Sequence, residues 1–102
     1  MKKILLVCNA GMSTSMLVAK MKKAAEELQV EVGIEAKSLS EAKDFVKEAD
    51  MVLLGPQIRY EKANVQKMAG RVPVEAIEMR DYGLMDGKKV LKRALEVMGN
   101  DG

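Results

Sequence analysis

ILLVCNAGMSTS, which spans residues 4–15, decides the fold of this chain. Its first four residues are apolar and predict a strand that ends at Cys8, the only cysteine. A short loop follows, with Gly11 and three hydroxyl side chains, and a helical pattern begins after it. A helix N-terminus presents unpaired backbone N–H groups and a positive partial charge. We therefore expect Cys8 to lie beside an anion-binding site, where the nucleophilic thiolate is favoured.

The composition limits the classes of function. With 102 residues the chain has the usual size of one domain, and we expect residues 1–102 to form a single domain. A net charge of +2, without a basic run interleaved with aromatic residues, argues against nucleic acid as a partner. The absence of histidine removes the commonest metal ligand and the usual general base, so no metal or other cofactor is expected.

The first residues and the single cysteine bear on the compartment. The apolar run after Lys2 and Lys3 is far shorter than the hydrophobic region of a signal peptide. No apolar stretch reaches the length of a membrane span. One cysteine cannot form a disulfide within the chain, which favours a reducing compartment. We expect a cytoplasmic protein.

Short apolar runs alternate with longer amphipathic segments, which is the pattern of strand–helix units. The predicted strands comprise residues 3–8, 30–36, 51–55 and 72–77. The predicted helices comprise residues 14–29, 39–49, 61–69 and 85–98. Ser38 and Glu41 have the spacing of a capping box for the second helix. We expect the buried face of that helix to consist of Leu39, Ala42, Phe45 and Val46.

The strand patterns predict an α/β fold with an open four-stranded parallel sheet and helices on both faces. Strands 3–8 and 51–55 are apolar on both faces, as central strands are. Strands 30–36 and 72–77 alternate, and the latter carries Pro73, which an edge strand tolerates. Right-handed crossovers then give the order 2-1-3-4. Ligands in such sheets bind at the carboxyl ends of the strands where the strand order reverses, and Cys8 lies there.

Two interpretations of Cys8 compete. A free cysteine at a strand end is often only a buried core residue. The glycine and hydroxyl residues that follow favour a nucleophile instead. Without a histidine, backbone amides and hydroxyls must activate the thiol, which suits phosphoryl transfer better than acyl transfer, where a base must deliver protons.

The loop after Cys8 resembles a phosphate-binding loop without its arginine. It lacks the glycine–lysine pattern of a nucleotide P-loop. It has the length of the Cys-x5-Arg loop of tyrosine phosphatases, but Thr14 stands where that arginine would clamp the phosphoryl oxygens. Such a loop is suited to holding a phosphoryl group and poorly suited to hydrolysing it. Its hydroxyls also fit helix capping, and both roles use the same geometry. The candidate phosphate-binding residues are Asn9, Ala10, Gly11, Met12, Ser13, Thr14 and Ser15.

The segment GPQIRY, residues 55–60, follows the third strand and is predicted to be a loop beside Cys8. Gln57 is a candidate for orienting this loop through hydrogen bonds. Ile58 and Tyr60 either dock a partner or pack in the core. We expect Arg59 to be a solvated or partner-facing charge rather than the missing phosphatase arginine.

The segment YGLMDG, residues 82–87, precedes the last helix. Tyr82 is a candidate supporting or partner-facing residue. Asp86 has the position of an N-cap. Asp81 lies where a phosphatase carries its general acid, but we rank this role below that of a plain loop carboxylate, because an acid would promote loss of the phosphoryl group.

CNAGMSTSMLVAKM, LLGPQIRY and YGLMDG, in this order and at these spacings, resemble the enzyme IIB component of the sugar phosphotransferase system, in its lactose/cellobiose/chitobiose family. The resemblance covers essentially the whole chain. It implies a fold similar to low-molecular-weight tyrosine phosphatases. It also implies that Cys8 accepts a phosphoryl group from a phosphohistidine on the IIA protein. The group then passes to a β-linked disaccharide, of the cellobiose or chitobiose class, bound in the membrane permease IIC.

The resemblance makes the protein peripheral to the membrane through IIC. Two other classes of function remain open at this point. One is a Cys-loop phosphatase or reductase of similar fold, against which the missing arginine counts. The other is a non-catalytic regulatory or interaction domain, for which Cys8 would be dispensable.

Overall fold

The computed structural model describes residues 1–8 and 11–99, with residues 11–13 described by their backbone alone. The strands are β1 (Lys2–Cys8), β2 (Val32–Ser38), β3 (Met51–Leu54) and β4 (Val74–Ala76). The α-helices are α1 (Gly11–Leu28), α2 (Leu39–Ala42), α3 (Lys62–Ala69), α4 (Met79–Gly83) and α5 (Gly87–Val97). Two 3-10 helices, η1 (Val46–Glu48) and η2 (Pro56–Glu61), flank β3.

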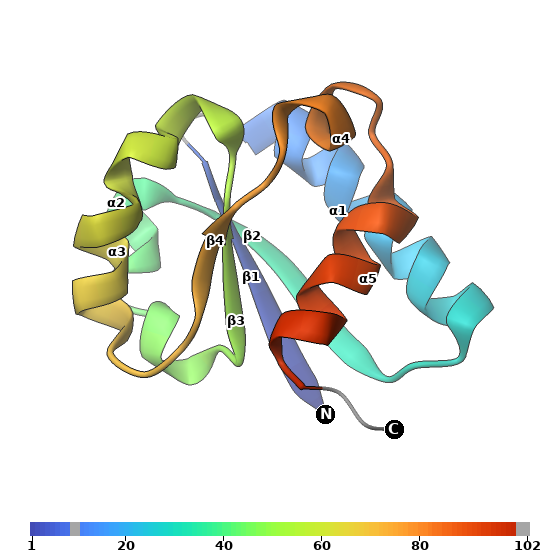
Figure 1. Ribbon diagram of the computed structural model, residues 1–102, viewed down its shortest axis with the longest axis horizontal. Coiled ribbons are helices and arrows are strands. Elements are labelled where there is room, and N and C mark those ends of the chain that lie inside the picture. The colour runs from blue at the N-terminus through green and yellow to red at the C-terminus, as the bar shows by residue number, and fades with distance from the viewer. Residues whose placement is uncertain (9–10, 100–102) are drawn as a thin grey trace.

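The four strands form one parallel sheet in the order β2-β1-β3-β4. Figure 1 shows this sheet between two helical layers, with α1 and α5 on one side and α2 and α3 on the other. The predicted fold class, strand order and placement of helices on both faces are therefore confirmed.

The central strand β1 is buried on both faces. Ile4 and Leu6 belong to the apolar cluster under α1 and α5, whereas Leu5 and Val7 belong to the cluster under α2 and α3. Full burial of a side chain of this size contributes about 1.5–3 kcal/mol. The continuous apolar run in the sequence thus has a direct physical reason, because both faces of this strand are covered by helices.

The second predicted helix, residues 39–49, is wrong in its length. Ser38 and Glu41 form the expected capping box, and hydrogen bonds from the backbone N–H and hydroxyl of Ser38 hold the pKa of Glu41 below its usual value. The helix ends at Ala42, and Phe45 leaves helical geometry with φ −122° and ψ −18°. Phe45 is not buried as expected. The residue is 37% exposed, and its ring centroid lies 4.5 Å from Lys37 Nζ, which is a cation–π contact.

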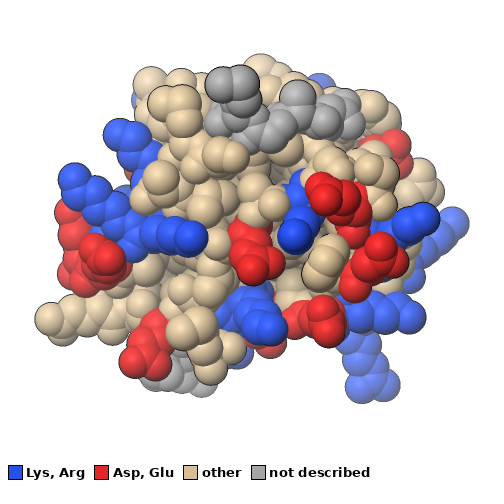
Figure 2. Space-filling view, turned by 180° about the vertical axis from the view of Figure 1, so that it is seen from behind, with Lys and Arg blue, Asp and Glu red and all other residues tan. Residues whose placement is uncertain are grey.

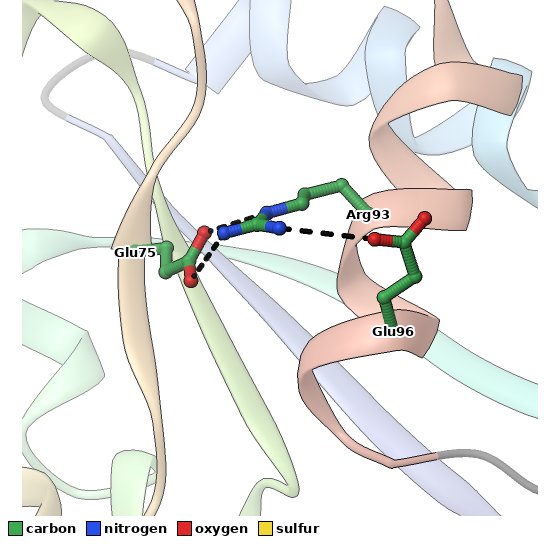
Figure 3. A network of polar contacts seen from close by, with 3 residues as sticks. All are labelled: Glu75, Arg93 and Glu96. Atoms are coloured by element: carbon green, nitrogen blue, oxygen red, sulfur yellow. Dashed lines mark hydrogen bonds and ion pairs between the residues drawn. The ribbon is translucent and has the colours of Figure 1, made fainter.

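The edge strand β4 is shorter than the predicted range 72–77, and a side chain of α3 bonds to backbone groups on its outer edge. Gln66 Nε2 donates to the carbonyl of Val72 at 2.8 Å, and Gln66 Oε1 accepts from the N–H of Val74 at 3.2 Å. Figure 3 shows Arg93 of α5 reaching Glu75 of this strand, with Nε 3.2 Å from Oε1, and also Glu96. Charged side chains of this kind discourage pairing of an edge strand with another chain, while each exposed ion pair stabilises the fold by only about 0–1 kcal/mol.

The strand β2 begins two residues later than predicted because Val30 belongs to the end of α1. The N–H of Val30 donates to Ala25 O at 3.0 Å and that of Gln29 donates to Glu26 O at 3.1 Å. These two bonds form a Schellman motif, in which the residue after the helix adopts left-handed geometry. Gln29 does so with φ 57°, a conformation that costs side-chain-bearing residues energy and that glycine adopts freely.

We predict that Gln29→Gly stabilises the protein by about 0.5–1 kcal/mol, because it relieves the left-handed strain at the end of α1. Chemical denaturation measured by circular dichroism gives the free energy of unfolding. The matched control is Gln29→Ala, which removes the same side chain and keeps the strain. Equal stability of the glycine and alanine variants would contradict the explanation.

Candidate functional site

Cys8 ends the central strand at the carboxyl edge of the sheet, the upper end in Figure 1. It pairs in register with Ser38 of β2 on one side, while the N–H of Gly55, which follows β3, donates to Val7 O at 2.9 Å on the other. The residue is 4% exposed. Cys8 therefore lies at the point where the strand order reverses, as predicted, and its burial alone fits both interpretations of the thiol.

The helix after Cys8 begins earlier than predicted. The expected start was residue 14, but α1 starts at Gly11. Hydroxyl residues favour helix caps, which suggested the later start. Packing overrides this preference, because Thr14 lies on the buried face of α1 together with Leu17 and Met21, at helical spacing. Two of the candidate phosphate-binding residues, Asn9 and Ala10, lie outside the described residues.

The early start changes the form of the predicted anion site. Residues 11–13 are the first three residues of α1, and backbone N–H groups at these positions have no partner within a helix. These donors and the helix dipole create a site for an anion three residues after the thiol. Within the described residues, the candidate phosphate-binding positions from Gly11 to Ser15 are therefore the start of a helix rather than part of a loop.

The hydroxyl residues point in different directions. Thr14 is 1% exposed, and its Oγ1 lies 3.3 Å from the hydroxyl oxygen of Tyr82 on α4, which is 8% exposed. Ser15 is exposed. The side chains of Met12 and Ser13 lie outside the described residues. The structure thus connects Thr14 to Tyr82, a contact between residues 68 positions apart that sequence spacing did not indicate.

The GPQIRY segment approaches Cys8 at its glycine. A methyl group on Gly55 would lie 3.5 Å from Cys8 Cβ and 3.1 Å from Gln57 Oε1. The segment forms the 3-10 helix η2 rather than the predicted loop, because Pro56 starts its first turn with the φ that such a turn requires. Gln57 is exposed, and its Oε1 lies beside Gly55.

The remaining side chains of η2 divide between core and surface. Ile58 is 0% exposed, which confirms the core alternative for this residue. Tyr60 is 71% exposed, so the core alternative for it is wrong. Arg59 is exposed, as expected for a solvated charge.

Asp81 is not the plain loop carboxylate that the sequence suggested. It lies in α4, is 8% exposed, and its Oδ1 is 3.3 Å from Lys89 Nζ of α5. A buried carboxylate needs such a partner. Asp86 is the N-cap of α5, as predicted, and accepts a hydrogen bond from the N–H of Lys89 at 3.1 Å.

The sequence reasoning missed the packing role of Gly87. A Cβ atom at this position would lie 2.6 Å from the backbone carbon of Lys20 and 2.6 Å from the backbone nitrogen of Met21. Only glycine lets the start of α5 approach the backbone of α1 so closely. In the sequence, the only sign of this contact is that Gly87 follows the N-cap residue Asp86. A glycine there indicates a turn as readily as a helix contact.

Exposed apolar side chains surround this end of the molecule. Met16 of α1 is 59% exposed and Tyr60 of η2 is 71% exposed. Met79 and Leu84, at the two ends of α4, are 66% and 68% exposed. Figure 2, turned half a revolution about the vertical axis of Figure 1, shows charged side chains over the middle and lower parts of the face and mostly uncharged ones at the upper end. The thiol thus lies at an end suited to contact with another protein.

Two further findings concern the described part of the chain. Within it, no set of three or more His, Cys, Asp or Glu residues is placed to hold a metal ion. Across the same residues, none of the helices combines the length and apolar character that a membrane crossing demands.

Comparison with known families gives a match over most of the chain. The model described as "PTS system, Lactose/Cellobiose specific IIB subunit" matches residues 3–93. The chain is 47% identical to the PTS system oligo-beta-mannoside-specific EIIB component of Bacillus subtilis (strain 168), over 98% of this chain and 99% of that protein. It is 44% identical to the PTS system galactose-specific EIIB component of Lactococcus lactis subsp. cremoris (strain MG1363), over 95% and 96%.

Solved structures agree with these relatives. The cellobiose-specific phosphotransferase IIB component protein of Borrelia burgdorferi superposes with a TM-score of 0.79 at 40% identity, over 99% of this chain and 94% of that chain. The lactose-specific IIB component domain of Streptococcus pneumoniae superposes with a TM-score of 0.83 at 21% identity, over 93% and 95%. At that lower identity the second likeness shows the fold alone.

We predict that Gly55→Ala slows alkylation of Cys8 by iodoacetamide, because the added methyl group crowds the thiol and displaces Gln57. The backbone at Gly55, with φ −59° and ψ 147°, accepts alanine, so the free energy of unfolding changes by about 1 kcal/mol or less. Gly83→Ala is the matched control, since a Cβ atom there meets nothing within 4 Å. Alkylation of Gly55→Ala at the wild-type rate would show that the two segments do not meet as described.

Proposed function

This chain belongs to the lactose/cellobiose-specific IIB family of the sugar phosphotransferase system, and we propose that Cys8 is its phosphoryl carrier. The observation that supports this role is the position of the thiol. Cys8 ends the central strand, three residues before the N-terminus of α1 and beside Gly55. A nucleophile and a set of anion-binding amides thus occupy the same edge of the sheet.

The proposed reaction has two transfers. In the first, the Cys8 thiolate attacks the phosphorus of a phosphohistidine on the IIA protein. The S–P bond forms as the N–P bond breaks, and the imidazole nitrogen keeps the electron pair. In the second, a sugar hydroxyl forms an O–P bond while the S–P bond breaks and the thiolate is regenerated. The hydroxyl proton leaves to a base outside this chain, which has no histidine.

We assign the phosphoryl oxygens to the backbone N–H groups of residues 11–13, which open α1. Backbone amides hold a dianion without adding a mobile positive charge. A tyrosine phosphatase uses an arginine at the sixth position after its cysteine, and here that position is Thr14, with its hydroxyl engaged by Tyr82. The site is therefore better suited to keeping the phosphoryl group than to hydrolysing it, which argues against the phosphatase alternative.

We propose a β-linked disaccharide of the cellobiose or chitobiose class as the final acceptor, bound in the membrane permease IIC. The 40% identity to a cellobiose-specific IIB protein supports this class. The 47% and 44% identities to oligo-beta-mannoside-specific and galactose-specific relatives make those sugars the competing acceptors. The exposed apolar side chains Met16, Tyr60, Met79 and Leu84 suit the successive docking of IIA and of the cytoplasmic side of IIC. The protein acts at the membrane through IIC.

We predict that incubation with a IIA protein carrying ³²P on its histidine labels this chain at a single site. Cys8→Ser should abolish the label, because a serine hydroxyl without a base is a far weaker nucleophile than a thiolate. Label is followed by gel electrophoresis and located by mass spectrometry of the peptide that contains residue 8.

The interpretation would fail if wild-type protein took no label, or if Cys8→Ser retained it. Rapid hydrolysis of p-nitrophenyl phosphate by the wild-type protein would support a phosphatase instead. The control is Gly83→Ala, whose added methyl group meets nothing within 4 Å and which should accept label at the wild-type rate.

A further inference from the structure

Two buried hydroxyl groups connect α4 to the first turn of α1. Thr14 Oγ1 and the hydroxyl oxygen of Tyr82 lie 3.3 Å apart, and the residues are 1% and 8% exposed. Among the described residues, no buried side-chain nitrogen or oxygen lacks a hydrogen-bond partner. The two hydroxyl groups therefore form a hydrogen bond with each other where water is excluded. Removal of one hydroxyl would leave the other buried without a hydrogen-bond partner.

We propose that Tyr82 is a positioning residue for the phosphocysteine site and that it acts through Thr14; this inference rests on the proposed function. Thr14 is the fourth residue of α1 and directly follows residues 11–13, whose backbone N–H groups have no partner within the helix and can bind an anion. A hydrogen bond that holds Thr14 fixes the orientation of the first turn of α1 relative to Cys8. Donors that are already oriented stabilise a transferring phosphoryl group without reorganising during the reaction.

The hydroxyl of Tyr82 is separable from the packing of its ring. The ring belongs to the apolar cluster that contains Leu17, Met21 and Leu91. Phenylalanine would fill the same space in that cluster, so the hydroxyl is not needed for the ring to be buried. Among the described residues, its contact with Thr14 is the one hydrogen bond recorded for this side chain.

The surroundings of α4 explain why the bond matters. This helix has five residues, too few to be stable by itself. The ion pair between Asp81 and Lys89 holds it to α5, and the Tyr82–Thr14 bond holds it to α1. Because the Lys89 side chain is exposed, dissolved salt screens its ion pair with Asp81. The buried hydrogen bond between Thr14 and Tyr82 is therefore the more specific of the two contacts.

The test compares phosphoryl transfer from ³²P-labelled IIA in Tyr82→Phe, Thr14→Val and the double variant. We expect each single substitution to slow labelling of Cys8 by about three- to tenfold, which is the range of one net hydrogen bond. The double variant should be no slower than the slower single variant, because both changes remove the same bond. Thr14→Ser keeps a hydroxyl and should restore most of the rate.

Val90→Ala is the control for a general loss of stability. Val90 is 5% exposed in the same apolar cluster, and its substitution should lower the melting temperature without slowing transfer. If Val90→Ala slowed labelling as much as Tyr82→Phe does, the effect of Tyr82 would be one of general stability, and the inference would be overturned. Additive slowing of labelling in the double variant would overturn it as well. If Tyr82→Phe does not fold, Thr14→Val and its comparison with Thr14→Ser decide the question.

The outcome separates the two proposals. A wild-type protein that takes no label would contradict the proposed function. A wild-type protein that is labelled, together with Tyr82→Phe labelled at the same rate, would contradict only the role of Tyr82.

Discussion

The burial of β1 between two parallel neighbours and two helical layers is the constraint on which the rest of the structure depends. Every residue from Ile4 to Cys8 is at most 4% exposed. A strand covered in this way has little freedom in register, since a shift by one residue would exchange the side chains of the two apolar clusters. The position of its last residue, Cys8, is therefore fixed by the packing of the strand.

The same constraint determines the surroundings of the thiol. Because β2 and β3 pair with β1 on opposite sides, the chain leaves the carboxyl ends of these strands in different directions, and a site forms between them. Gly55 lies beside Cys8, so that a methyl group on it would be 3.5 Å from Cys8 Cβ. Because Gly87 has no side chain, the start of α5 packs directly on the backbone of α1, the helix that begins three residues after Cys8. Close backbone packing thus places the thiol, Gly55 and the start of α1 at the same end of the molecule.

Sequence patterns predicted the strand order and the caps well because each depends on local residues. The two-sided apolar runs of β1 and β3 identify central strands, and Ser38 and Asp86 lie at caps with a clear spacing rule. The errors arose where tertiary packing overrides local preference. The start of α1 depends on the burial of Thr14, and the exposure of Phe45 depends on where the chain turns toward β3.

The candidate site was predictable only in part. The thiol, its strand end and the helix after it follow from the sequence alone. The Thr14–Tyr82 bond, the Asp81–Lys89 pair and the contact of Gly87 with α1 join residues that no local rule connects. These contacts require knowledge of how α4 and α5 fold back on α1.

The central claim is that the first turn of α1 holds a phosphoryl group bound to Cys8. Backbone ¹H–¹⁵N spectra recorded before and after phosphorylation by IIA test it directly, with ³¹P spectra to detect the S–P bond. We predict that the largest amide shifts fall on residues 11–13 and on the residues next to Cys8, as hydrogen bonds to an anion form. An S–P signal without shifts in the first turn of α1 would contradict it.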